Sequence, residues 1–382
     1  MIKPGYKRLG DYIEPMDERN SNLSVKLSQG ICNNKYFITP RQVAENSAND
    51  KIVRTGQFAY NRATTRNGDK ISIAYREGPD CTVSSAYQIF RIKDENKLNP
   101  HYLWMWFRRP EFDRYARFKS RGSAHEFFEW DEMCEVYLPI PDIEEQRRIV
   151  AEYQAVEKRI ATNDALIAKL EETAQIIYKD MFVNNVDLAN LPKGWIMGTL
   201  ESLGEIVSGA TPSTEVPEYW DDYGIAWLSP ADLSREGTLF MSRGAKSISA
   251  LGYKSASTKL LPKGSVLFSS RAPIGLMAIA DGDLCTNQGF KSIVPHSKVG
   301  TEYVYYVLLN LKDRIANENT GATFAEVSGS TMKMYEALIP DEKTCKEFSK
   351  KILPLHDYIK NIEHENKALT NLLSLLLSKL TK

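Results

Sequence analysis

The chain has 382 residues, of which 49 are basic, 49 are acidic and 42% are hydrophobic. This length and apolar content predict two or three domains with ordinary cores and exclude global disorder. The net charge of zero excludes a uniformly basic surface, so any basic nucleic-acid-binding surface must be local.

The cysteines indicate a reducing compartment. Their number is odd and none forms a C-x-x-C pair; they are Cys32, Cys81, Cys134, Cys285 and Cys345. This usage predicts free thiols in a cytoplasmic protein and offers no zinc site. The first five residues do not form a signal peptide, and the longest apolar run is too short to span a bilayer, so no membrane partner is expected.

Residues 1–141 predict a first globule that consists mainly of strands. Short β-rich runs at Ile71–Tyr75 and Tyr87–Ile92 lie between clusters of Gly, Pro, Asp and Asn. One helix is expected near Tyr102–Phe107, with its aromatic side chains in the core. The class expected for the globule is therefore α+β.

Residues 142–182 predict a long central helix. Apolar residues recur at alternating steps of four and three from Ile149 to Met181, and only Asn163 in this series is strongly polar. This spacing is the heptad seam of a coiled coil. Asp142 can cap the first turn, and Glu145 is placed to complete a capping box.

The same organisation returns in residues 183–340 and 341–382. In the second globule, β-rich runs at Ser265–Phe268 and Leu276–Ala280 precede one helix near Tyr303–Leu311. A second heptad seam begins at Phe348, which lies 199 residues after Ile149, and its polar member is Asn366. A second long helix is therefore expected at residues 341–382.

Shorter matches link the two globules at drifting offsets. They are Leu9–Asp11 with Leu203–Glu205, Gly56–Arg62 with Gly264–Arg271, which aligns Arg62 with Arg271, and Cys81–Thr82 with Cys285–Thr286. Drifting offsets indicate loops of unequal length on a shared scaffold. The chain is therefore predicted to be a tandem duplication of globule and long helix.

The two seam asparagines predict how the helices pair. Residues that face each other in an antiparallel pair have a constant sum, and Asn163 facing Asn366 places Ile167 opposite Ile362. A parallel in-register pair would bury two unpaired amides, each at a cost on the order of 1–3 kcal/mol. The asparagines therefore predict an antiparallel coiled coil whose register they set. The alternative is that both amides reach solvent at the edge of the seam.

Six short motifs follow one another in the second globule: L-P-K-G-W (191–195), S-G-A-T-P (208–212), Y-W (219–220), W-L-S (227–229), S-R-A-P-I-G (270–275) and T-N-Q-G-F (286–290). In this order they resemble a target-recognition domain of the specificity subunits of type I restriction–modification enzymes. The helix start P-D-I-E-E-Q (141–146) resembles that family's spacer helices, so the resemblance covers essentially the whole chain. The first globule lacks the S-G-x-T-P and double-Trp block.

The resemblance implies two pseudo-repeated α/β target-recognition globules, each reading half of a bipartite, asymmetric target in double-stranded DNA. The long helices would set the spacing of the halves. Methyltransferase (modification) subunits, which bind S-adenosylmethionine, and a restriction/translocase subunit would dock on the helices, so this chain is expected to hold no cofactor and to be non-catalytic. Two alternatives remain, the specificity subunit of a fused restriction–methylation enzyme and a coiled-coil scaffold that binds protein.

Candidate DNA contacts are polar side chains on Gly-flanked loops, because short donors and acceptors read base edges and Arg and Lys bind phosphates. In the second globule they are Thr211, Ser213, Ser269, Ser270, Arg271, Asn287 and Gln288. In the first they are Asn61, Arg62, Thr64, Arg66, Asn67, Ser84 and Ser85. A basic run that suits phosphates contains Arg114, Arg117, Lys119 and Arg121. The alternatives are a turn at Thr211, buried-backbone partners at Asn287 and Gln288, and a solvated helix face for the basic run.

No catalytic or metal site is predicted. Asn99–Tyr102 matches only part of the N-P-P-Y loop of amino-methyltransferases and is better explained as a helix start. The five histidines lack metal-ligand spacing, and no Walker loop is present. The sequence therefore favours binding over bond-making.

Overall fold

The structure is a computed structural model that describes residues 4–40, 48–64, 70–120, 126–271, 273–319 and 325–380. The chain forms two compact units. Unit 1 contains residues 1–161 and 368–382, and unit 2 contains residues 162–367. Both long helices, α4 (Ile143–Lys179) and α9 (Glu342–Lys379), contribute residues to each unit.

Unit 1 is built around a four-stranded sheet in the order β2-β9-β6-β7. Its members are β2 (Ile13–Met16), β9 (Tyr87–Ile92), β6 (Phe58–Asn61) and β7 (Ile73–Tyr75). Three strand pairs complete its described part: β1 (Tyr6–Arg8) with β10 (Tyr137–Pro139), β3 (Gly30–Ile31) with β4 (Phe37–Ile38), and β5 (Lys51–Val53) with β8 (Cys81–Val83). The described helices are the 3-10 turn η1 (Leu9–Asp11), α1 (Pro100–Phe107), α2 (Pro110–Lys119) and α3 (Trp130–Cys134).

Aromatic residues fill the core of unit 1. Phe58, on β6, stacks on Phe90 of β9 with ring centroids 5.0 Å apart, and Phe107 of α1 packs edge-on against both rings. The same core takes in Tyr153 from α4 and Leu376 from α9. The aromatics expected to be structural are therefore core residues, and parts of both long helices belong to this core.

Unit 2 has a five-stranded sheet in the order β12-β19-β16-β17-β14 and a three-stranded sheet in the order β15-β13-β18. The strands are β12 (Gly204–Ser208), β13 (Trp220–Leu228), β14 (Phe240–Met241), β15 (Lys246–Ile248), β16 (Val266–Ser270), β17 (Ile274–Ala280), β18 (Cys285–Thr286) and β19 (Lys291–Pro295), with a further pair of β11 (Ile196–Thr199) and β20 (Glu336–Ile339). The described helices are η2 (Asp180–Asn184), η3 (Leu200–Ser202), η4 (Pro217–Tyr219), α5 (Pro230–Glu236), α6 (Ala250–Ser255), α7 (Thr301–Glu318) and α8 (Gly329–Met334).

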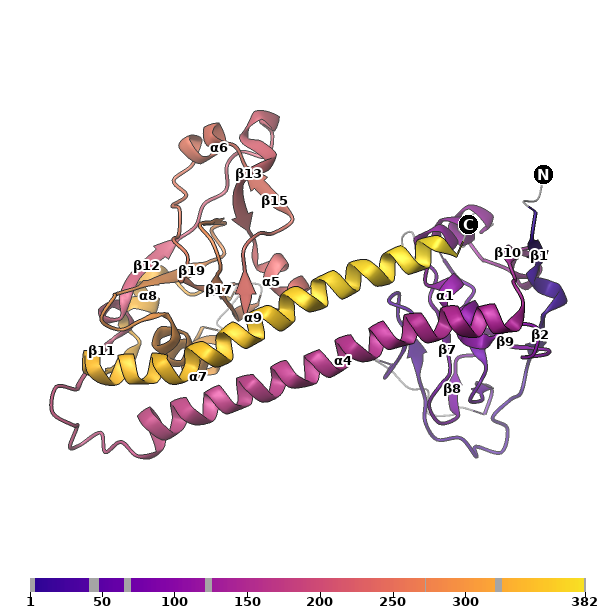
Figure 1. Ribbon diagram of the computed structural model, residues 1–382, viewed down its shortest axis with the longest axis horizontal. Helices are drawn as coiled ribbons and strands as arrows, with labels where there is room; N and C mark the ends of the chain where they lie inside the picture. The colour runs from indigo at the N-terminus through magenta and orange to yellow at the C-terminus, as the bar shows by residue number, and fades with distance from the viewer. Residues whose placement is uncertain are drawn as a thin grey trace. The chain divides into compact units, whose positions relative to one another are not determined.

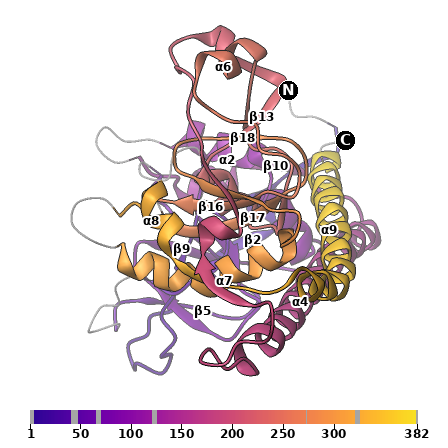
Figure 2. The same ribbon diagram turned by 90° about the vertical axis from the view of Figure 1, so that its left-hand side faces the viewer.

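The two sheets of unit 2 have separate surroundings. Figures 1 and 2 show α6 and β13 at one end of the unit and α7 at the other, with strands of the five-stranded sheet between them. The core beside α7 contains Phe268, Tyr303, Phe348 and Ile352, and so joins the sheet to α7 and α9. The prediction of one helix in each globule is wrong, because short helices such as α2 and α5 begin at prolines that the β-rich pattern obscured.

Polar side chains set where the helices begin. Asn99 accepts hydrogen bonds from the amides of His101 and Tyr102, so the N-P-H-Y sequence is a helix N-terminus. Asp142 accepts from the amide of Glu145 at 3.0 Å, but the Glu145 carboxylate pairs with Arg148, so the expected capping box does not form.

The two units repeat particular hydrogen bonds. The hydroxyl of Tyr102 donates to Pro139 O at 3.0 Å, and that of Tyr303 donates to Leu338 O at 2.8 Å. The amide of Leu9 donates to Val136 O, as that of Leu200 donates to Tyr335 O. The expected match of Leu9 with Leu203 is therefore wrong, because strand pairing places Leu200 in the equivalent position.

Within unit 2, side chains of α4 contact side chains of α9. Tyr178 packs against Phe348 with ring centroids 6.0 Å apart. Asn163 is buried, and its Nδ2 donates to Oδ1 of Asn366 at 2.8 Å. Asn366 Nδ2 in turn donates to Oδ1 of Asp164 at 2.7 Å. The Asn163 amide thus has its partner within the seam, whereas the Asn366 amide bonds to Asp164, which is exposed at the edge of the seam.

Candidate nucleic-acid interface

The motifs that suggested a recognition domain converge in unit 2. The amide of Ala210 donates to Thr286 O at 2.9 Å, and the Thr211 hydroxyl donates to Oε1 of Gln288. A Cβ at Gly209 would lie only 2.1 Å from Asn287 O, so this close approach requires glycine. The S-G-A-T-P and T-N-Q-G-F segments therefore contact each other. Together with neighbouring segments they form a surface that we call the loop cluster, which consists of residues 208–213, 269–271, 286–291 and 325–328.

The two tryptophans brace the loop cluster from β13. Trp227 Nε1 donates to Ala210 O at 3.0 Å, and Trp220 Nε1 donates to Ser213 O at 3.2 Å. Their rings meet edge to face, with centroids 5.2 Å apart. The double-Trp block thus holds the S-G-A-T-P-S loop in place through its backbone carbonyls.

The serines at the end of β16 are structural. Ser269 is fully buried; its hydroxyl donates to Pro273 O at 2.7 Å and accepts from Leu276 N at 2.8 Å. Ser270 is also fully buried, and its hydroxyl has no hydrogen-bond partner among the described residues. The prediction that these two hydroxyls are presented to DNA is therefore wrong for this conformation, because the strand junction encloses them.

Arg271 lies at the rim of the loop cluster, with a side chain that is 37% exposed. Its Nη1 is 3.7 Å from Oε2 of Glu326, and Nζ of Lys291 is 3.9 Å from Oε1 of the same carboxylate. Burial lowers the pKa of Lys291, and nearby Glu326 partly opposes this effect. Lys291 was missed from sequence, although it directly follows the T-N-Q-G-F motif.

The remaining candidates of unit 2 differ in exposure. Gln288 and Ser213 are exposed, whereas Thr211 and Asn287 are half-buried. Asn287 Oδ1 accepts from Gly289 N at 2.8 Å and so shapes its own turn. Gln288 and Ser213 are the exposed polar side chains of this set.

In unit 1, Arg62 joins two of the predicted loops. Its Nη1 lies 3.2 Å from Oε2 of Glu129, and its Nε donates to Ala86 O at 3.3 Å. The loop that contains Ala86 also exposes Ser84 and Ser85. Arg62 therefore links the segment after β6 to the segment before β9.

Two neighbouring candidates of unit 1 act on the backbone. Asn61 is half-buried and accepts from Ala63 N at 3.1 Å. Thr64 is 2% exposed and its hydroxyl donates to Glu126 O at 3.2 Å, so its predicted exposure is wrong. Arg66, Asn67 and Arg121 lie outside the described residues.

The basic run on α2 is a set of ion pairs. Arg114 lies 3.4 Å from a Glu111 oxygen, and Lys119 lies 3.0 Å from a Glu132 oxygen. Arg117 pairs with Glu126. The described members of the run thus have carboxylate partners.

Bridge contacts correct the alignment of the two arginines. Ala63 pairs with Phe127, and Arg271 pairs with Glu326 in the same kind of isolated bridge. The glycines that open the two turns, Gly56 and Gly264, both have φ near 87°. Arg271 therefore matches Ala63, and the predicted match of Arg62 with Arg271 is off by one residue.

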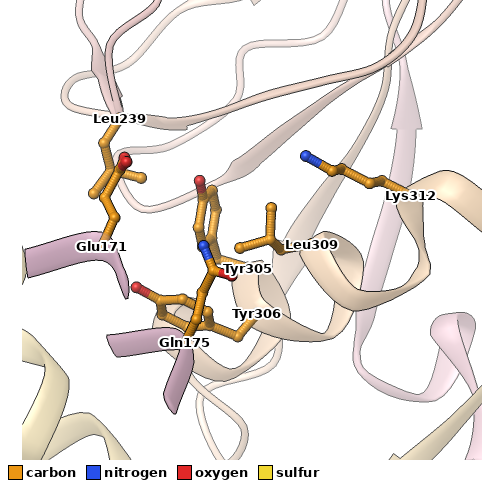
Figure 3. Close-up of a pocket in the computed structure, with 7 residues that line it drawn as sticks. All are labelled: Glu171, Gln175, Leu239, Tyr305, Tyr306, Leu309 and Lys312. Atoms are coloured by element: carbon orange, nitrogen blue, oxygen red, sulfur yellow. The ribbon is translucent and has the colours of Figure 1, made fainter. Parts of the chain in front are cut away.

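A pocket of about 210 Å³ lies elsewhere in unit 2, against α7. Figure 3 shows that its lining includes Glu171 and Gln175 on one helix and Tyr305, Tyr306, Leu309 and Lys312 on another, with Leu239 beside them. Burial raises the pKa of the Glu171 carboxyl, and Lys312 opposes that rise. Among the described candidate DNA residues, none lines this pocket.

Metal-binding clusters and membrane-spanning helices are both absent from the part of the chain that the structure describes. The described residues contain no group of three or more His, Cys, Asp and Glu side chains that could hold a metal ion. None of the helices in the described ranges combines the length and the apolar character needed to cross a bilayer.

A match to a family model places the chain in a known class. The model of the type I restriction modification DNA specificity domain matches residues 23–172 and, again, residues 192–374. The chain therefore belongs to this family, and the resemblance inferred from the motifs is confirmed.

The chain is similar to particular specificity subunits. It is 36% identical over 185 residues to the type I restriction enzyme MjaIX specificity subunit of Methanocaldococcus jannaschii, an alignment that covers 48% of this chain and 43% of that protein. It is 22% identical over 405 residues to the type I restriction enzyme HindI specificity subunit of Haemophilus influenzae, covering 86% of each chain. The S subunit of a type I restriction–modification system from M. genitalium has a similar fold, with a TM-score of 0.58, 12% identity, and coverage of 99% of this chain and 96% of that one.

Proposed function

We propose that this chain is the DNA sequence-recognition subunit of a type I restriction–modification complex, and that each recognition domain reads one half of a bipartite, asymmetric target. The observation that carries the proposal is the loop cluster, where Thr211, Gln288 and Arg271 lie on segments joined by hydrogen bonds. Exposed amides and hydroxyls can read base edges, and an arginine can bind a guanine edge or a phosphate.

The proposal assigns residues 1–141 and 183–340 to two pseudo-repeated recognition domains, and residues 142–182 and 341–382 to two spacer helices. The repeated tyrosine hydrogen bonds of Tyr102 and Tyr303 support this division, as does the start of α4 and α9 just after Asp142 and Asp341. A shared scaffold with different loops would let the two domains read different sequences.

The spacer helices are proposed to pair as an antiparallel coiled coil. The Asn163–Asn366 hydrogen bond supports this register, because a shift by one heptad would leave both amides without a partner in an apolar seam. A fixed register would hold the two recognition domains at one separation along the DNA.

Methyltransferase subunits that bind S-adenosylmethionine, and a restriction/translocase subunit, are proposed to dock on the spacer helices. Large apolar side chains on α9 that are exposed in this chain support a protein-binding role for that helix: Leu353, Tyr358, Leu372 and Leu375. The chemistry of methylation and cleavage would then belong to those partners, and this chain would act in the cytoplasm.

Domain exchange tests the proposal. Residues 1–141 are replaced with the matching region of the HindI specificity subunit, and the preferred duplex is selected from a random library with methyltransferase subunits present. Only one half of the selected target should change, and exchange of residues 183–340 should change only the other half. If both halves change together in either chimera, the two domains do not read independently.

A further inference from the structure

Cationic side chains in both proposed interfaces pair with glutamates. In unit 1, Arg62, Arg117 and Lys119 pair with Glu129, Glu126 and Glu132, which lie just before or within α3. In unit 2, Arg271 and Lys291 share Glu326, which lies just before α8. The Arg271–Glu326 bridge and its unit 1 counterpart, Ala63–Phe127, put the two acidic segments in equivalent places.

Glu326 is held beside its two cations by the backbone. The amide of Val327 donates to Ser270 O at 2.9 Å, directly before Arg271. The carboxylate lies 3.7 Å from Arg271 and 3.9 Å from Lys291, longer than the roughly 2.7–2.9 Å of a close charge-assisted hydrogen bond. It therefore neutralises charge without binding either cation tightly.

The exposure of this group allows exchange with a ligand. The Glu326 side chain is 42% exposed and that of Arg271 is 37% exposed, whereas that of Lys291 is only 10% exposed, so Arg271 is the cation that a ligand reaches first. A phosphodiester group of DNA is also a monoanion that offers two oxygens, and it can take the place of the carboxylate beside the exposed Arg271. DNA that offers only its backbone must displace Glu326 to reach Arg271, whereas a matching sequence also supplies base contacts that offset this displacement.

We propose that Glu326 is a specificity-determining residue, whose carboxylate occupies the phosphate-binding position of Arg271 and Lys291 in the free protein and so suppresses binding to non-target DNA. This inference rests on the proposed function, since it assumes that the loop cluster faces DNA. Glu326 acts through the two cations and lowers their attraction for any phosphate, with the largest effect where base contacts are missing.

The test compares the full chain with Glu326→Gln. Fluorescence anisotropy titrations use a duplex that contains the selected target and a scrambled duplex of the same length, over a range of salt concentrations. The variant should bind the scrambled duplex roughly fivefold more tightly, with a smaller gain on the target. The slope of log affinity against log salt should steepen by about 0.9, because one more phosphate contact forms.

Three controls isolate the role of Glu326. Glu347→Gln removes the same charge from an exposed position on α9 and should change neither affinity nor slope. Glu326→Asp keeps the charge and should behave like the parent chain. Adding Arg271→Ala to Glu326→Gln should cancel most of the gain, because Arg271 is the cation released.

Two results would overturn the inference. One is an unchanged affinity and salt slope for scrambled DNA in Glu326→Gln. The other is that Glu326→Gln loses affinity only for targets with a particular base pair at one position. Glu326 would then accept a hydrogen bond from a cytosine amino group. Failure of the proposed function itself has a different signature, which is that the parent chain prefers no duplex over any other.

Discussion

Replacing Glu363 with glutamine should change how the stability of unit 2 depends on pH. Glu363 lies on α9, and its carboxylate accepts from Leu239 N at 2.5 Å and from Phe240 N at 3.3 Å. Burial raises the pKa of this carboxyl from 4.5 to about 7, the two backbone hydrogen bonds oppose the rise, and the charges of Glu171 and Asp281 add to it.

The charges around Glu363 come from several elements. Asp281, after β17, is paired with Lys360 of α9 and lies 3.4 Å from Lys263. Glu171, on α4, is influenced by Lys312 of α7. The lysines therefore interact with the carboxylates of Asp281 and Glu171. The hydrogen-bond partners of Glu363 are the backbone amides of Leu239 and Phe240.

The sign of the effect follows from proton binding. Between pH 4.5 and about 7 the folded chain retains the Glu363 proton that the unfolded chain releases, so stability falls as pH rises through this window. The raised pKa corresponds to a loss of about 3 kcal/mol across the window. Glutamine keeps an oxygen for Leu239 N and does not titrate, so Glu363→Gln should remove this loss.

Urea unfolding at a series of pH values measures the effect, with circular dichroism and tryptophan fluorescence as signals for the whole chain, whose six tryptophans lie three in each unit. The free energy of unfolding of Glu363→Gln relative to the parent should rise by about 3 kcal/mol between pH 4.5 and 8. The exposed-site variant Glu347→Gln should follow the parent curve. A constant difference between Glu363→Gln and the parent at every pH would refute the reasoning, because it would mean that folding does not change how tightly this carboxyl binds its proton.

Two further variants test the seam and the loop cluster. Asn163→Ile should lower the free energy of unfolding by about 1–3 kcal/mol, because Oδ1 of Asn366 loses the donor that Asn163 supplies. Converting both residues to isoleucine should recover most of that loss in a double-mutant cycle. Equal losses in the single and double variants would argue against the pair. Gly209→Ala should weaken DNA binding at least tenfold, because its methyl group would lie about 2.1 Å from Asn287 O. Gly282→Ala serves as the control in the same titration, because its Cβ would meet nothing within 4 Å.

The long helices could be predicted from sequence because their signals are local. The heptad spacing from Ile149 and from Phe348, and the capping residues Asp142 and Asp341, depend only on neighbours within one or two turns. The order of the motifs in residues 191–290 likewise indicated the family without any knowledge of contacts. The register of two paired periodic helices can also be predicted from residue numbers alone. This prediction placed Asn163 opposite Asn366.

Strand pairing decided which residues are equivalent in the two repeats and which side chains the candidate site exposes. Leu200 takes the place that sequence similarity had given to Leu203, because the pairing of β11 with β20 sets the register. Ser269 and Thr64 looked like exposed loop residues, yet the chain closes over both. Such burial depends on segments that are distant in sequence, so a local pattern of Ser, Thr and Gly does not reveal it.

The charge state of the candidate interface was decided only by the tertiary structure. In sequence, Arg62, Arg271 and Lys291 are isolated cations, and their carboxylate partners lie tens of residues further along the chain. An ion pair requires two side chains to meet within about 4 Å, and the fold of the intervening chain alone determines whether they do. Local periodicity therefore determined the long helices and the order of short motifs indicated the family, whereas long-range packing decided which polar groups face solvent and which cations are neutralised.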